Sequence, residues 1–312
     1  MKKALILVNL TGLIIGISYG LHGPILPVFA KNVIGATYSE LGLIGLANFI
    51  PDRVRNISWF TMFFVLGFMI GPLLGTVILE EIDFAYRLLF QITAFILATA
   101  IITALLVSRR NIKDHHEKFS ISSIKQMKKF PEVIILLIFC TSSFGIILSI
   151  YPAFLNDNGM SDTDILLLYF SFGVSRVISL ALAGKLSRHT SRTLMSATIA
   201  ISLGLALSVV ADSIFVYGAA LVLMGFGFSI FFPLTLEIIL SKTRKGISGK
   251  IIGAYETVFG IGWAIGPTIG GPLTQSFGDQ APYFVFFIIG IGVSTLAILS
   301  RKKLEPRRIQ RI

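Results

Sequence analysis

The chain has 312 residues, of which 54% are hydrophobic and only 14% are charged, and its formal net charge is +11. This composition leaves too little polar surface to cover a soluble domain of that size. A basic chain can bind nucleic acid, but no basic groove with interleaved aromatic residues is present, so we exclude that partner. We therefore predict an all-α polytopic membrane protein, with the lipid bilayer as its first partner.

Long apolar segments follow one another along the chain, each close to the ~20 residues that a helix needs to cross a bilayer. A tenth, shorter segment at 39–50 stops at Pro51, and its helix would reach only about 18 Å across a hydrocarbon core of ~30 Å. The charges further along the chain require it to cross, by local thinning of the bilayer or by recruiting flanking residues. The clear segments are 4–29, 57–79, 84–108, 132–155, 164–184, 193–211, 213–240, 248–273 and 282–300.

The positions of the basic residues predict the orientation. If the N-terminus is cytoplasmic and all ten segments cross, the 27 lysines and arginines lie in inside loops, except for Lys31, Arg87 and Arg176. This distribution follows the positive-inside rule and predicts a multi-pass protein of the plasma membrane with both termini in the cytoplasm. The apolar run after Met1 continues to Ala30 without a convincing cleavage site, so we interpret it as a retained first helix.

One glycine pattern occurs twice. Residues 67–75 read G-F-M-I-G-P-L-L-G, and residues 262–271 read G-W-A-I-G-P-T-I-G-G. Glycines four positions apart let a neighbouring helix approach closely, and proline removes a backbone hydrogen bond and can bend the helix. Plain helix packing explains one such motif, but two copies at equivalent places are more specific. The residues of the two patterns are Gly67, Gly71, Pro72, Gly75, Gly262, Gly266, Pro267, Gly270 and Gly271.

Two offsets measure this internal repeat. Pro72 and Pro267 are 195 residues apart, whereas Pro27 and Pro152, which lie in similar stretches, are 125 apart. The first half is therefore about 70 residues shorter than the second, with the break between residues 42 and 53. We predict an incomplete N-terminal bundle at 1–108, a basic cytoplasmic linker at 109–131, a complete six-helix bundle at 132–301 and a basic tail at 302–312.

Arg176 is a charge inside an apolar segment. It lies nine residues before Lys185, about 13 Å from the cytoplasmic end of its helix. An arginine near a helix centre costs ~2.5–3.5 kcal/mol on insertion scales, so it should face a cavity or a partner. The alternative is a side chain that extends along the helix to water. Glu237 and Glu256 lie at comparable depth, and either could pair with Arg176.

Tyr19 and His22 are three residues apart and share a face of the first segment, whose outer end is interrupted by Pro24 and Pro27. One hypothesis makes them contacts for a substrate or a proton in a central cavity. The other places His22 at the outer interface of the membrane.

With these residues together, the chain resembles the major facilitator superfamily, whose members have twelve helices in two six-helix halves. The stretch from Gly67 resembles the antiporter motif of the family's fifth helix, with Thr76 in place of the last glycine, and the stretch from Gly262 repeats the motif in full. A degraded copy of the family's loop motif follows the segment of Arg176. Its matching residues are Gly184, Leu186 and Arg192, while Arg188 replaces the acid and Ser191 replaces the second glycine.

The resemblance implies a two-bundle fold with an incomplete first bundle of helices matching the first, part of the second, the fifth and the sixth, and nine or ten helices in all. It implies alternating-access transport of a small organic solute, with or without a proton, and leans toward export. It also implies that the second and fifth helices pack against the eleventh and eighth. The alternative is a non-transporting remnant, or a bundle that takes its missing helices from another membrane chain.

Other chemistry finds little support. Gly16 to Gly20 match G-x-S-x-G, but a nucleophile elbow needs a strand-turn-helix context rather than a membrane helix, so no enzyme is expected. His115 and His116 lack further spaced ligands for a metal, and neither a phosphate loop nor H-E-x-x-H occurs. We expect no cofactor and no metal.

Overall fold

The computed structural model describes residues 2–41, 57–81, 85–108, 127–243 and 248–306. Most of the short segment 39–50, the predicted break between 42 and 53, and most of the linker 109–131 lie outside these residues. The described part has helical residues from Tyr38 to Leu41, at the start of this short segment.

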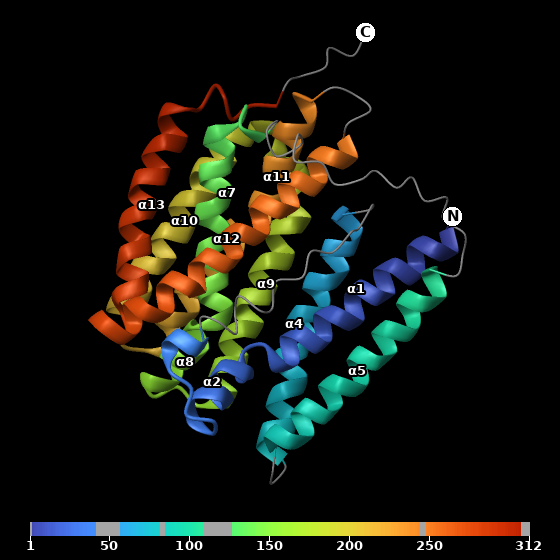
Figure 1. Ribbon diagram of the computed structural model, residues 1–312, viewed down its shortest axis with the longest axis vertical. Helices are drawn as coiled ribbons and strands as arrows, with labels where there is room; N and C mark the ends of the chain where they lie inside the picture. The colour runs from blue at the N-terminus through green and yellow to red at the C-terminus, as the bar shows by residue number, and fades with distance from the viewer. Residues whose placement is uncertain (1, 42–56, 82–84, 109–126, 244–247, 307–312) are drawn as a thin grey trace.

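Helices make up the described architecture, and their bounds follow the apolar segments closely (Figure 1). In chain order they are α1 (Lys2–His22), α2 (Ile25–Asn32), α4 (Ile57–Glu81), α5 (Ala85–Ser108), α7 (Pro131–Ser149), α8 (Tyr151–Asp157), α9 (Asp162–Leu186), the short η1 (Ser187–His189), α10 (Thr190–Val210), α11 (Ile214–Ser241), α12 (Ser248–Phe277) and α13 (Ala281–Leu299).

Seven segments of the described residues are long and apolar enough to span a membrane, and one of them, Asp162–Val210, takes in both α9 and α10. The helix α12 is 30 residues long but is not among the seven. Its many glycines, together with Lys250 and Glu256, make it less apolar than its neighbours. The helix α12 packs along α7, which is among the seven.

Proline interrupts two equivalent helices. The first helix ends at His22 and resumes as α2 after Pro24, which confirms the predicted interruption. The expected single segment 132–155 is also broken, since α7 ends at Ser149 and α8 begins with Tyr151 and Pro152. A proline has no amide hydrogen and its ring displaces the preceding turn, which explains both breaks.

The helices form two groups that meet along α4 and α9. On one side α1 packs against α4 and α5, and on the other α11 packs between α9 and α10 while α12 packs against α7. The short helices α2 and α8 contact each other at one end of the molecule, and α1 begins and α13 ends toward the opposite end (Figure 1). Most of the buried apolar residues belong to the second group.

Candidate functional site

The two glycine patterns make the same contact in the two groups. A Cβ atom on Gly20 would lie 2.9 Å from Cδ of Pro72, and one on Gly145 would lie 2.8 Å from Cδ of Pro267. Gly20 and Gly145 are 125 residues apart, and the two prolines are 195 apart, so both sequence offsets meet at one contact. The repeat is therefore also a repeat of structure, in which α1 with α4 corresponds to α7 with α12.

Most of the glycines allow close packing within one group. Gly67 and Gly71 lie against the backbone of α1, while Gly262, Gly266 and Gly270 lie against α7. The last glycine of each pattern reaches the opposite group instead. Gly75 faces Leu166 of α9, and Gly271 lies against the backbone of Tyr38. The patterns therefore hold each group together and also contribute to the boundary between the groups.

Arg176 lies at that boundary and is buried, with 4% of its surface exposed. Its Nε atom donates a hydrogen bond to Oγ of Ser229 at 3.1 Å, whereas its Nη1 atom is buried without a hydrogen-bond partner. The guanidinium is therefore buried within the protein and does not extend to water.

Four phenylalanine rings surround this guanidinium. The Cζ atom of Arg176 lies 5.1–5.5 Å from each ring centre, within the ~6 Å range of cation–π attraction. The rings come from four helices, α4, α7, α9 and α11, and belong to Phe68, Phe144, Phe172 and Phe228. The contacts described for Arg176 are thus ring faces and a hydroxyl rather than Glu237 or Glu256. Glu237 is exposed and Glu256 is half-buried.

Tyr19 and His22 lie next to this ring cage. Their rings are 5.5 Å apart, as their spacing predicts, and the Tyr19 ring is 6.1 Å from Phe68. The Nδ1 atom of His22 is 2.6 Å from the carbonyl oxygen of Ser18. Because a carbonyl only accepts, Nδ1 carries the hydrogen and Nε2 is left as the second ring nitrogen for another partner.

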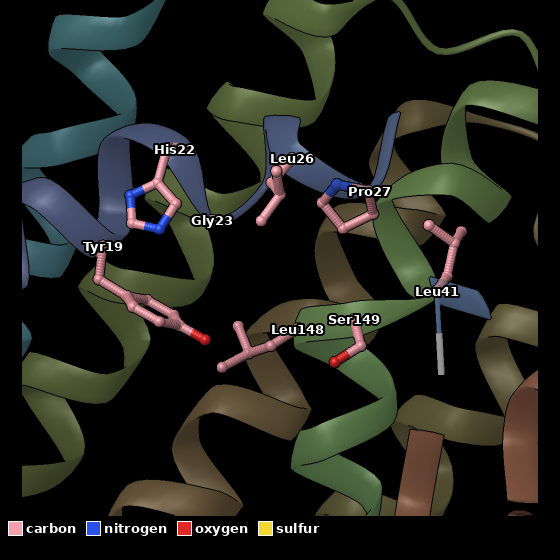
Figure 2. Close-up of a pocket in the computed structure, with 8 residues that line it drawn as sticks. All are labelled: Tyr19, His22, Gly23, Leu26, Pro27, Leu41, Leu148 and Ser149. Carbon is pink, nitrogen blue, oxygen red and sulfur yellow. The ribbon is translucent and has the colours of Figure 1, made fainter. Parts of the chain in front are cut away.

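A small cavity connects these residues with the second group. It has room for about one water molecule. Figure 2 shows the Tyr19 hydroxyl pointing into it, toward Leu148 on α7. The lining residues are Tyr19, His22, Gly23, Leu26, Pro27, Leu41, Leu148 and Ser149. The structure therefore places Tyr19 and His22 at an internal cavity between the groups.

The loop-motif residues lie far along the chain from this cavity, at the turn between α9 and α10. Gly184 and Arg192 are exposed and Leu186 is half-buried. Ser191, which stands in place of the motif's second glycine, is buried and donates a hydrogen bond to Glu305 of the C-terminal segment. This contact ties the C-terminal segment to the start of α10.

A set of polar contacts joins the two groups where α2 meets α8, and we name it the polar latch. Lys31 forms an ion pair with Asp157, and the Tyr38 hydroxyl donates to the same carboxylate. Burial, together with this hydrogen bond, raises the pKa of Tyr38 above its usual value, so its hydroxyl remains a donor. The latch also includes the Asn32 amide, which donates to Asn156 at 2.8 Å, and the Ser39 hydroxyl, which donates to Gln275 at 2.5 Å.

The polar latch repeats the symmetry of the chain. At the 125-residue offset, Lys31 corresponds to Asn156 and Asn32 corresponds to Asp157. Lys31 contacts Asp157, which is the counterpart of Asn32, and Asn32 contacts Asn156, which is the counterpart of Lys31. Such crossed contacts are typical of an interface between two-fold related partners. These residues are not among the site residues predicted from the sequence, although they lie in the similar stretches around Pro27 and Pro152. Two adjacent polar residues at equivalent positions of the two halves were the signal that could have indicated this contact.

Comparisons with known proteins match these observations. The sequence profile of the Major Facilitator Superfamily matches residues 46–267 and, in a second match, 133–311. Among solved structures, 128 chains match, including a crystal structure of the nucleoside transporter NupG. That match has a TM-score of 0.58 at 11% identity and covers 96% of this chain and 91% of that one. No curated protein sequence matches.

Proposed function

We propose that this chain, which belongs to the major facilitator superfamily, carries a small organic solute across a membrane by alternating access of its two helix groups. The first group is the incomplete N-terminal bundle at 1–108 and the second is the six-helix bundle at 132–301. The cavity beside Tyr19 and the cage around Arg176 lie between the two groups, on the route that we propose for the solute.

The polar latch is the observation that carries this proposal. Ion pairs and hydrogen bonds at a partly exposed boundary contribute little free energy each, so they can break and form again. Lys31 and Asp157 are each about a quarter exposed. Contacts between α4 and α9 continue from the latch end toward the middle of the molecule. They include Gly75 with Leu166 and Met69 with Gly173. The geometry supports a state that is closed at the latch end.

Orientation and coupling are part of the same proposal. The basic loops and tail support placing the termini in the cytoplasm, which makes the latch an outer gate of a plasma-membrane protein. The glycine pattern from Gly67 supports export. For proton coupling, the candidate groups are His22 at the cavity and the carboxylates Glu237 and Glu256.

Flux in proteoliposomes tests the proposal. The purified chain is reconstituted and offered benzoate, uridine and benzyltrimethylammonium as labelled anionic, neutral and cationic solutes, with and without a pH gradient. Uridine is included because NupG is described as a nucleoside transporter. We expect saturable flux of at least one solute, and we expect Arg176→Ala to abolish it. Flux indistinguishable from that of empty liposomes would contradict transport.

A second candidate function is that of a bundle completed by another membrane chain, or of a remnant without transport. The burial of α5 favours it, because 17% of its apolar window is buried, against 33% for its counterpart α13. The missing helices would otherwise lie near this group. Under this alternative the chain alone gives no flux, and it co-purifies in stoichiometric amounts with a second chain that restores flux.

A further inference from the structure

The ring cage leaves hydrogen-bond donors without acceptors. Nη1 of Arg176 is buried and unpaired, and so is Nε1 of Trp263. Both residues border the same side chain, since Phe144 lies 5.1 Å from the Arg176 guanidinium and 4.8 Å from the Trp263 ring. Buried donors in folded proteins nearly always have a partner, so a pair of orphans beside one ring indicates a site for an acceptor.

The charge of Arg176 specifies the kind of acceptor. A buried charge is costly unless it is paired, and arginine is charged at any physiological pH. Four ring faces attract the guanidinium, but they carry no net negative charge. Within the described contacts of Arg176, the one hydrogen-bonding group is the Ser229 hydroxyl, which is neutral. A ligand that brings one negative charge would balance the guanidinium.

The walls of the cage specify the rest of the ligand. Phe144 and Phe228 stack with ring centres 3.6 Å apart, and Phe172 and Phe68 complete an apolar surface around the guanidinium. Such walls favour an apolar body attached to the charged group. A carboxylate suits the guanidinium because its two oxygens can accept two parallel hydrogen bonds.

We propose that the Arg176 cage binds the carboxylate of a small organic monoanion with an apolar body, and that Arg176 is the charge-selecting residue of the site. This inference rests on the proposed transport function, because it names the class of solute that the chain carries. Phe68 brings the first helix group into the cage, so a bound anion contacts both groups and links binding to their relative motion.

The test uses the tryptophan that borders the cage. The chain has two tryptophans, so a Trp59→Phe background leaves Trp263 as the single fluorophore. The purified full chain is titrated with benzoate and hexanoate, and separately with benzamide and hexanamide, which have the same bodies without the charge. We expect saturable changes in Trp263 fluorescence, with a Kd at least tenfold lower for each acid than for its amide.

Variants then assign the effect to Arg176. Arg176→Gln is expected to weaken benzoate binding about tenfold or more, whereas Arg176→Lys keeps the charge and weakens it less. Lys303→Ala serves as the control, because it removes a cation that pairs with Glu132 on the same helix group, away from the cage. Size-exclusion profiles check that each variant folds, and the acid-to-amide comparison needs no variant at all.

Two outcomes would overturn the inference: equal binding of acids and amides, or no saturable binding of either acid. Flux of uridine or of the cation alongside such a result would leave the transport proposal standing. Conversely, tight benzoate binding that depends on Arg176, combined with no flux of any solute, would support the anion site and contradict transport.

Discussion

The two glycine seams, α1 with α4 and α7 with α12, have the same internal contacts but different surroundings. The apolar window of α7 is 78% buried, whereas that of its counterpart, which runs from α1 into α2, is 50% buried. The second seam is contacted by α10, α11 and α13, whereas the first is contacted by α5 and α9. The small residues of each seam allow its two helices to pack closely, and we expect the neighbouring helices to limit how far the two can shift.

The largest expected effect comes from adding a methyl group to each seam. A Cβ atom at Gly266 would lie 2.0 Å from the Ser142 carbonyl oxygen, and one at Gly71 would lie 2.5 Å from that of Ile17. We expect Gly266→Ala to cost about 3 kcal/mol and Gly71→Ala about 1 kcal/mol, because the less enclosed α1 can shift. Thermal unfolding in detergent measures both.

Gly253→Ala is the matched control for this pair, because nothing lies within 4 Å of its added Cβ on the same helix α12. It should unfold at the wild-type temperature or slightly above it, because alanine favours a helix over glycine. Equal losses at Gly71 and Gly266 would show that enclosure does not set the rigidity of the seam.

The next effect concerns Arg176, which lies on α9 at the boundary between the two groups. Replacing a buried, unpaired charge by an apolar side chain of similar length is expected to stabilise the fold. Arg176→Met should therefore raise the free energy of unfolding by about 2 kcal/mol while it abolishes carboxylate binding. A less stable Arg176→Met protein would indicate that the guanidinium supports the fold instead of serving a ligand.

A smaller effect distinguishes the two halves of the polar latch. Asp157 holds two partners, Lys31 and Tyr38, whereas Asn156 holds the neutral Asn32 across the boundary. We expect Asp157→Asn to shift the closed state by about 1 kcal/mol, or roughly fivefold, and Asn156→Ala to shift it less. Labelling of Ser149→Cys at the cavity, in a Cys140→Ser background, reports the opening. An unchanged labelling rate in Asp157→Asn would mean that the polar latch does not stabilise the closed state.

The smallest effect is expected within the second group alone. Lys303 pairs with Glu132, but the Lys303 side chain is 69% exposed. An exposed pair contributes about 0–1 kcal/mol, so Lys303→Ala should change thermal unfolding little and flux not at all. A strong loss of flux would show that the C-terminal segment takes part in the motion.

The sequence predicted the parts of the fold that depend on local pattern. Apolar length located the helices, and Gly71 with Gly266 located the two seams, because close packing demands small residues at a fixed spacing. The confirmed family agrees with the resemblance that these residues carry.

What the sequence did not predict depends on residues that meet across helices. Phe68, Phe144 and Phe228 lie on separate helices, and in a chain with 26 phenylalanines nothing marks these as ligands of one guanidinium. The same chain carries acids at a depth similar to that of Arg176, so an ion pair was the simpler expectation. The latch residues of α2 and α8 lie at helix ends, where polar residues are common, so the sequence did not show which residues they contact.

The most direct test of alternating access is a reversible crosslink across the polar latch. Ser39→Cys and Gln275→Cys, in the Cys140→Ser background, replace a pair that the structure joins by a hydrogen bond of 2.5 Å. A short, cleavable methanethiosulfonate crosslinker should stop flux in proteoliposomes, and a reductant should restore it. The same reagent on Lys303→Cys with Glu132→Cys, within one helix group, should leave flux unchanged. Undiminished flux through the crosslinked latch would contradict the account.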